Sequence, residues 1–198
     1  MRYEKGHKEQ THKRVLDVAG ARFRANGIEG TGIAGLMAEV GLTHGGFYAH
    51  FKSKDDLVRK ALSEVHAHSR GAWVAEAKAA RERGGDGLEA IVRQYLRTAH
   101  RDQPESGCSV ATLASEVARN DPRTREIMAD AASEIVAVIA AELPSTFPPE
   151  KATEIAYAIF GQMIGTLQLA RVTMDPAICE AILRSGREAA LRLAREGV

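Results

Sequence analysis

The chain has 198 residues, of which 44% are hydrophobic and 27% are charged, and its formal net charge is +1. This length allows one domain with a sizeable core, or a small domain joined to a larger one. Two cysteines exclude a disulfide scaffold, and no apolar run approaches the ~20 residues that cross a bilayer, so we expect a cytoplasmic protein without membrane contact.

The first predicted helix runs from about Glu9 to Arg24, and Asn26-Gly27 can end it in a left-handed turn. Its apolar residues share one face: Val15, Leu16, Ala19 and Phe23. Residues 1–54 hold nine Lys or Arg against five Asp or Glu, whereas residues 55–198 hold eighteen against twenty-one. Positive charge therefore gathers at the N-terminal end of the chain.

A short helix, a glycine turn and a second short helix are predicted next. The first carries an apolar stripe at helical spacing, which stops before Gly41: Ile33, Leu36, Met37 and Val40. Thr43 is a suitable N-cap for the second, whose inner face would hold Phe47 and Phe51. The pattern indicates a helix-turn-helix, a motif that places its second helix in the major groove of DNA.

This segment resembles the signature of the TetR family of transcriptional regulators. The resemblance covers roughly residues 10–60 as a motif, and beyond them it extends only to a pattern of helices. It rests on these residues: Gly41-Leu42-Thr43, Gly45, Phe47-Tyr48, His50-Phe51, Lys54 and Leu57. We therefore expect a helix-turn-helix DNA-binding domain over residues 1–52 and a helical domain for ligand binding and dimerisation over residues 53–198.

Six residues are predicted to contact DNA. Thr43 and His44 begin the second short helix, where side chains reach base edges, and Gly45 suits a close approach of the backbone. Tyr48 and His50 resemble the family's pair of phosphate contacts, with Lys54 completing the anchor. The alternative for Tyr48 is partial packing in the core with its hydroxyl in water.

A second argument, independent of the resemblance, supports a phosphate contact at Lys54. It follows the predicted N-cap Ser53, and a cation in the first turn of a helix opposes the helix dipole. A phosphate across that helix end would reverse the sign of this cost. The basic residues near the N-terminus taken alone indicate a solvated arm, but beside a helix-turn-helix they indicate further phosphate contacts: Arg2, Lys5, Lys8, Lys13 and Arg14.

The rest of the chain is predicted to be helical. A long helix runs from Ser53 to about Ala80, and glycines at 84, 85 and 87 end it. Further helices are predicted over residues 88–99, 108–119, 122–143, 149–172 and 176–196, and prolines mark the starts of the last three. No segment alternates as a strand does. We predict an all-α protein of about nine helices, with a three-helix head on a larger bundle.

The last two helices are predicted to form a homodimer. Gly161 and Gly165 lie one turn apart and permit close helix approach, and Ile178 and Ile182 extend an apolar face nearby. The resemblance implies a four-helix interface built from these helices of both subunits. The alternative is that both faces pack within one subunit.

A pocket for a small-molecule effector is implied by the resemblance. An apolar cavity with one or two polar groups is expected, and we predict no cofactor and no metal site. The larger side chains of the body are the candidates for its lining: Trp73, Tyr95, His100, Leu113, Met128, Tyr157, Phe160 and Met163.

The leading hypothesis is a homodimeric repressor that a small molecule releases from a palindromic DNA operator. One alternative is an adaptor with the same fold that acts through protein partners. Another is a regulator that senses oxidants or electrophiles at Cys108, which follows Gly107 at a predicted helix start; Cys108 is otherwise a small buried hydrophobe. An enzyme with a His100–Cys108 pair is disfavoured, because no orienting Asn or Asp motif accompanies the pair.

Overall fold

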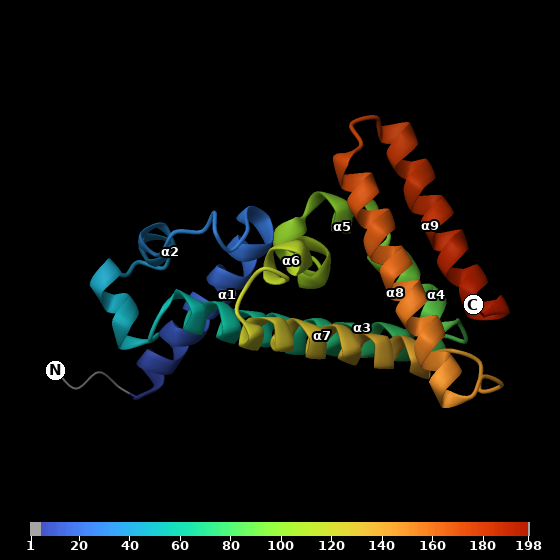
Figure 1. Ribbon diagram of the computed structural model, residues 1–198, viewed down its shortest axis with the longest axis horizontal. Coiled ribbons are helices and arrows are strands. Elements are labelled where there is room, and N and C mark those ends of the chain that lie inside the picture. Colours follow the sequence, from blue (N-terminus) through green and yellow to red (C-terminus); the bar gives the residue numbers. More distant parts are fainter. Residues whose placement is uncertain (1–4, 198) are drawn as a thin grey trace.

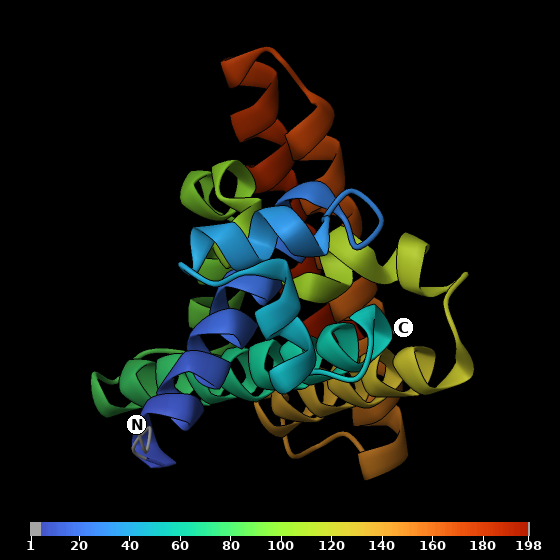
Figure 2. The ribbon, with the colours of Figure 1, turned by 90° about the vertical axis from the view of Figure 1, so that its left-hand side faces the viewer.

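The computed structural model describes residues 5–197, and in this part of the chain it contains nine α-helices, two 3₁₀-helices and no strand. The predicted all-α class is therefore confirmed. Figure 1 shows an elongated molecule with a small helical head at one end and a larger bundle at the other, and Figure 2 views it from the head end.

The head consists of α1 (Lys5–Asn26), α2 (Ile33–Glu39) and a 3₁₀-helix, η1 (His44–Ala49). Gly27 ends α1 at φ +79°, and Gly41 makes the turn after α2 at φ +72°, a region that L side chains rarely adopt. The predicted second helix of the motif is thus a 3₁₀-helix and not an α-helix. The neighbouring glycines Gly45 and Gly46 have low α-helix propensity, and the N–H of His50 donates to the carbonyl of Phe47 at 2.9 Å.

Helix α3 (Lys54–Glu82) joins the head to the body. The hydroxyl of Ser53 accepts the N–H of Asp56 at 3.1 Å, and the Asp56 carboxylate accepts the N–H of Lys52 at 3.0 Å, so the predicted cap is confirmed. Four residues of this helix pack in the core of the head, whereas Ala77 packs in the body: Leu57, Val58, Ala61 and Leu62.

The helix predicted over residues 88–99 is two helices, α4 (Gly87–Tyr95) and α5 (Thr98–Asp102). A continuous helix would use the carbonyls of Tyr95 and Leu96 for the next turn. Side chains bind both carbonyls instead: Nδ1 of His100 lies 2.7 Å from Tyr95 O, and Nη1 of Arg187 lies 2.7 Å from Leu96 O. The chain turns there and continues through a short 3₁₀-helix, η2 (Pro104–Ser106).

Four helices complete the body: α6 (Ser109–Val117), α7 (Pro122–Ala141), α8 (Pro149–Val172) and α9 (Pro176–Glu196). The predicted proline starts of the last three are confirmed. Asp121 and Asp175 cap α7 and α9 through backbone N–H groups. Helix α7 runs beside α3, and α8 pairs with α9.

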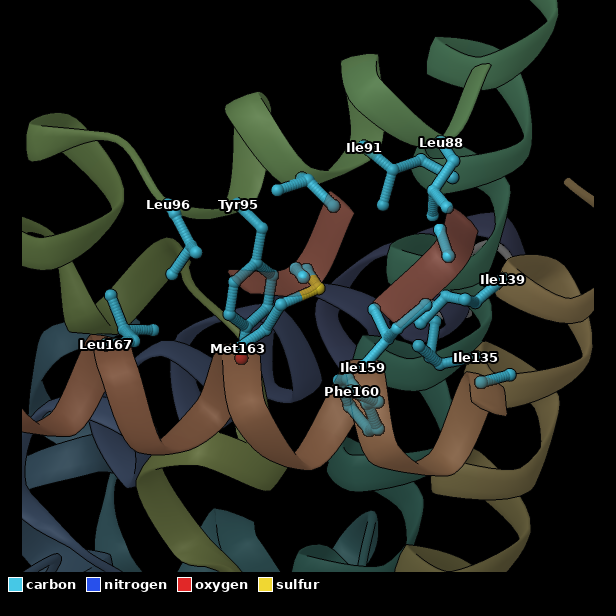
Figure 3. Packing of buried hydrophobic residues seen from close by; sticks show 14 of the residues in the cluster. Leu88, Ile91, Tyr95, Leu96, Ile135, Ile139, Ile159, Phe160, Met163 and Leu167 are labelled. Carbon is cyan, nitrogen blue, oxygen red and sulfur yellow. The ribbon is translucent and has the colours of Figure 1, made fainter. Parts of the chain in front are cut away.

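Two hydrophobic clusters hold the molecule together. The body cluster lies between α4, α7, α8 and α9, and Figure 3 shows Ile91 and Tyr95 of α4 directed toward α8. The head cluster surrounds Phe23, Phe47 and Phe51, and it also includes Leu113 of α6 and Met128 of α7. The head therefore packs directly on two helices of the body.

Candidate DNA-binding surface and body cavity

The outer surface of η1 is supported from inside by two phenylalanines. Phe47 and Phe51 are 0% and 2% exposed, as predicted for the inner face, whereas Tyr48 is 64% exposed. The Tyr48 ring stands edge-on to Phe47 at 5.2 Å between centroids and edge-on to His44 at 6.2 Å. The side chain of Tyr48 is thus not packed in the core, and its hydroxyl lies on the surface of the head.

The remaining predicted contacts lie around Tyr48. Thr43, His44 and Gly45 are exposed, and His50 and Lys54 are half-buried. The Thr43 oxygen accepts the N–H of Gly46 at 3.2 Å, which leaves the hydroxyl proton available to donate. In the first two turns of α3, Lys60 forms an ion pair with Asp56, with 2.9 Å between Nζ and Oδ2. All six predicted residues therefore fall within one stretch, from the turn before η1 to the first residue of α3.

His50 is paired with a second histidine of the head. The ring of His12 stacks on Phe51 at 4.7 Å and lies 5.9 Å from the ring of His50. Burial first, and then His12 and Lys8, lower the pKa of His50 below its ordinary value. Among the described residues, Nδ1 of His50 is buried without a hydrogen-bond partner. These surroundings favour the neutral ring in the free protein, whereas a nearby phosphate would favour its protonation.

The basic residues predicted to form an arm have different surroundings. Arg2 lies outside the described residues, and Lys5 begins helix α1. Lys8 and Lys13 are exposed, and Nζ of Lys13 lies 3.7 Å from Oδ1 of Asp17. Arg14 donates to the carbonyl of Val40 at the end of α2, so it binds the head together. From Lys5 onward the backbone of this segment is part of helix α1.

A cavity of about 310 Å³ lies in the body between α3, α4, α6 and α7. Three of the eight candidates for a pocket lining are among the residues that line it: Trp73, Tyr95 and His100. The other five candidates are not among its lining residues. Leu113 and Met128 belong to the head cluster, Phe160 and Met163 to the body cluster, and Tyr157 is 51% exposed.

Sequence reasoning missed several residues of the cavity wall, of which His66 is the most informative. His66 continues the apolar face of α3 one turn after Leu62, and that spacing is the signal that it is buried. Its Nε2 lies 2.8 Å from the hydroxyl of Ser109. Burial first, and then Arg24, lower the pKa of His66 to about 4, so the ring is neutral at pH 7.

His100 and Cys108 both line the cavity, but the contact between them is made by the backbone N–H of Cys108 and not by its thiol. Nε2 of His100 accepts the N–H of Cys108 at 3.0 Å, and Nδ1 therefore carries the proton that is donated to Tyr95 O. Both ring nitrogens are thus engaged with main-chain atoms. His100 is not placed to take the proton of the Cys108 thiol, which removes the geometry that an enzymatic pair requires.

A carboxylate of the body holds the head, and sequence reasoning did not find it. Glu116 of α6 accepts two backbone N–H groups of the loop between α1 and α2: Ile28 to Oε2 at 2.9 Å and Glu29 to Oε1 at 2.7 Å. Arg24 of α1 also donates to the carbonyl of Glu105 in η2 at 2.7 Å. The segment that forms one wall of the cavity, residues 106–110, is therefore continuous with the helix that binds the head.

The last two helices leave an apolar face open within the chain. Outside the glycine's own helix, no atom of the described chain would lie within 4 Å of a Cβ added at Gly161 or Gly165. Ile178 is 54% exposed, whereas Ile182 is half-buried against the body cluster. Gly186 is the glycine that permits α8 and α9 to approach, since its added Cβ would lie 2.3 Å from Thr166.

Neither a membrane helix nor a metal cluster is found in the part of the chain that the structure describes. None of its helices is both long and apolar enough to cross a bilayer. Its His, Cys, Asp and Glu side chains form no group of three or more that could hold a metal ion.

Comparison with protein families gives two adjoining matches. A model described as "Transcriptional regulator LmrA/YxaF-like, C-terminal domain" matches residues 85–184, which is half of the chain. A second, described as "Bacterial regulatory proteins, tetR family", matches residues 15–61 and thus the head.

Individual proteins match over most of the chain. The HTH-type transcriptional regulator LmrA of Bacillus subtilis is 24% identical over 155 residues, which cover 78% of this chain and 82% of that protein. An uncharacterised HTH-type transcriptional regulator of Mycobacterium tuberculosis is 26% identical over 172 residues, covering 82% and 85%.

Solved structures share the fold. A TetR transcriptional regulator from Chloroflexus aurantiacus superposes with a TM-score of 0.76 at 22% identity, covering 95% of this chain and 96% of that one. The reduced form of Escherichia coli NemR has a TM-score of 0.72 at 19% identity, covering 90% and 96%.

Proposed function

Because this chain belongs to the TetR family of bacterial regulatory proteins, we propose that it is a homodimeric repressor that leaves a palindromic operator when a small molecule fills the body cavity. The observation that carries the DNA-binding part is the surface around η1. Thr43, His44 and Tyr48 are exposed there on a turn that Phe47 and Phe51 anchor from inside. Rigid support of this kind holds side chains in the register that base and phosphate contacts require.

Each predicted contact has a role in this proposal. Thr43 and His44 read base edges in the major groove, and the backbone at Gly45 approaches the DNA closely. Tyr48, His50 and Lys54 bind phosphates and fix the orientation of the head. Lys54 is the first residue of α3, so a phosphate bound there would also interact favourably with the N-terminus of that helix.

A dimer follows from the small size of one head and from the open face of α8 and α9. Leu169, Val172 and Ile178 are more than half exposed on these helices. Pairing with the same face of a second subunit would bury them, and Gly161 and Gly165 would allow the helices to approach closely. Two heads could then read half-sites about 34–36 Å apart on one side of the DNA.

The effector part of the proposal is supported by the cavity and its connection to the head. A ligand that occupies about 310 Å³ beside residues 106–110 would press on the start of α6. Glu116, near the other end of α6, holds the loop that precedes α2. Displacement of α6 would therefore change the angle of the head, and with it the spacing of the two heads on DNA.

Replacing Glu116 by glutamine is expected to loosen this connection. An amide can accept from only one of the two N–H groups and presents its NH₂ to the other, so we expect a loss of about 1–3 kcal/mol in the free energy of unfolding. Hydrogen exchange of Ile28 and Glu29 should accelerate, as measured by mass spectrometry or NMR. The neighbouring Ser115→Ala, at an exposed position, is the control. Unchanged exchange over residues 27–32 would show that Glu116 does not hold the head.

The function is tested by fluorescence anisotropy of the protein with DNA from the region upstream of its own gene. Saturable binding to a palindrome is expected, with an affinity that falls steeply as salt rises, because phosphate contacts release counterions. Weak binding without sequence preference at every salt concentration would contradict the proposal that the protein regulates its own promoter. A phenotype that is independent of DNA binding would favour the adaptor hypothesis.

A further inference from the structure

A hollow of about 280 Å³ lies on the head, between the first turns of α1 and the end of η1. Four of its five lining residues carry ionisable side chains: Lys8, Glu9, His12, Ala49 and His50. Lys8 and Glu9 are exposed, and the two histidines are half-buried. The hollow adjoins the predicted DNA-binding surface, because His50 directly follows η1 and belongs to both.

The net charge of the hollow depends on its two imidazoles. Lys8 and Glu9 bring opposite charges that offset each other. The rings of His12 and His50 lie 5.9 Å apart between centroids. With both rings neutral the lining has no net charge, whereas one protonated ring makes it positive. Protonation therefore decides whether the hollow attracts an anion.

The surroundings of His50 disfavour its protonation in the free protein. Burial first, and then His12 and Lys8, lower its pKa. Its Nδ1 is buried and has no hydrogen-bond partner among the described residues. A protonated imidazole carries a hydrogen on both ring nitrogens, so the N–H at Nδ1 would be a buried donor without an acceptor. An additional negative charge is needed to favour the protonated form.

The charges around His12 come from two helices and act in both directions. Burial is the largest cause of its lowered pKa, and the charges of Lys60 on α3 and Lys8 on α1 also lower it. Asp56 and Glu64 of α3 raise it. Asp56 is itself paired with Lys60 at 2.9 Å, so its attraction for a proton on His12 is partly offset. The free protein thus holds His12 in the same state as His50.

Phe51 can accommodate a charged His12. The two rings are stacked at 4.7 Å with their planes 21° apart, and Phe51 is 2% exposed, so the position of His12 is fixed from below. The face of a phenylalanine ring carries partial negative charge and attracts a cation. The contact that orients His12 therefore also favours its protonated form, and it keeps the ring on the wall of the hollow.

We propose that this hollow binds a phosphate of the DNA backbone between His12 and His50, and that DNA binding is coupled to proton uptake by this pair. The inference rests on the proposed function, because it requires the head to bind DNA. The proton comes from solvent, and the phosphate oxygens accept N–H groups of the charged imidazoles. His12 and Lys8 belong to α1, so this contact lies outside the helix-turn-helix motif.

The direction of the pH dependence follows from the charge of the phosphate. A bound phosphate raises the pKa of both histidines, so the complex holds more protons than the free protein and DNA affinity rises as the pH falls. The rise begins below the pKa of the DNA-bound histidines. It levels off below the pKa of the free histidines, which lies under the ordinary 6.5. Between pH 8 and 6 a dimer should gain about tenfold or more in affinity.

The coupling is tested by NMR titration of the histidine rings in the free protein and with a short duplex of arbitrary sequence at low salt. Such a duplex suffices because phosphate contacts do not depend on sequence. The pKa values of His12 and His50 are expected to be higher in the complex. His68 is exposed on α3 outside the hollow, so its pKa should change less. Unchanged values for His12 and His50 would overturn the proposal.

A charge variant tests the hollow without altering either histidine. Glu9→Gln removes the exposed negative charge of the lining, and DNA affinity at low salt is expected to rise about threefold or more. Asp17→Asn is the matched control: it removes the same charge from α1, but Asp17 faces Lys13 at 3.7 Å and does not line the hollow. Equal effects of the two changes would show that only the net charge of the head matters.

The contribution of His12 is measured with His12→Gln, whose polar side chain takes up no proton. The gain in DNA affinity between pH 8 and 6, measured by fluorescence anisotropy, should fall by about half or more. Circular dichroism checks that the variant is folded; if it is not, the Glu9→Gln comparison and the NMR titration decide. A folded variant with the pH profile of the parent protein would exclude His12 from the site.

The outcomes separate this site from the regulatory function. Saturable operator binding with unchanged pKa values of His12 and His50 would contradict the phosphate site and leave the regulator standing. Binding without sequence preference, with raised pKa values in the complex, would contradict the regulator and leave the phosphate site standing. A protein that binds no duplex at low salt would contradict both.

Discussion

Replacing both Tyr48 and Lys54 by alanine is expected to weaken operator binding by at least about ten-thousandfold without unfolding the head. Hydrogen bonds to charged groups contribute about 1.5–3 kcal/mol each, and a dimer would lose two such contacts from each of its heads. Tyr48 is 64% exposed, so truncating it removes little buried area. Fluorescence anisotropy gives the affinity, and thermal unfolding reports the stability.

The salt dependence of the same variant identifies the kind of contact that is lost. Removing Lys54 from both heads should lower the slope of log affinity against log salt by about 2. Lys78→Ala is the matched control, because this exposed lysine lies in the body half of α3, 3.8 Å from Glu82. If the double variant binds the operator within threefold of the parent protein, Tyr48 and Lys54 are not phosphate contacts.

Replacing Gly161 and Gly165 together by leucine is expected to convert the proposed dimer to a monomer. Within one chain the change is expected to be tolerated, since an added Cβ at either position would meet no atom of the described residues within 4 Å outside its own helix. At an interface where two copies of α8 approach closely, the same side chains would hold the helices apart. Sedimentation velocity across protein concentrations measures the oligomeric state.

The control for this variant is Gly71→Leu. Gly71 is also an exposed helical glycine with open space around it, but it lies on α3. That variant should stay dimeric and bind the operator, whereas the double variant should lose most of its operator affinity because single heads bind weakly. A double variant that remains a dimer would place the subunit contact on another face.

The elements of the fold were predictable because their signals are local. Apolar residues at helical spacing predicted α1 and α2, and the caps at Ser53, Asp121 and Asp175 predicted where helices begin. The residues around η1 were also predictable, because a helix-turn-helix places turn, cap and anchor at short fixed spacings. The 3₁₀ form of η1 was missed, although two adjacent glycines were the signal for it.

The break between α4 and α5 was not predictable, because its cause is distant in the sequence. Arg187 donates a hydrogen bond to the carbonyl of Leu96 from 91 residues away, and no residue near Leu96 indicates this contact. The same holds for the glycines of α8 and α9. Sequence spacing drew attention to Gly161 and Gly165, but only packing reveals that Gly186 faces Thr166 within the chain.

The sequence by itself determined most of the helices, the helix-turn-helix segment and the family, since each depends on residues that are close along the chain. Tertiary structure alone decided which side chains share the cavity and what holds the head. Tyr95 and Cys108 come from different helices, and Glu116 reaches Ile28 across 88 residues. Such contacts arise when amphipathic faces pack, and packing depends on the shape of every face at once, which no local pattern encodes.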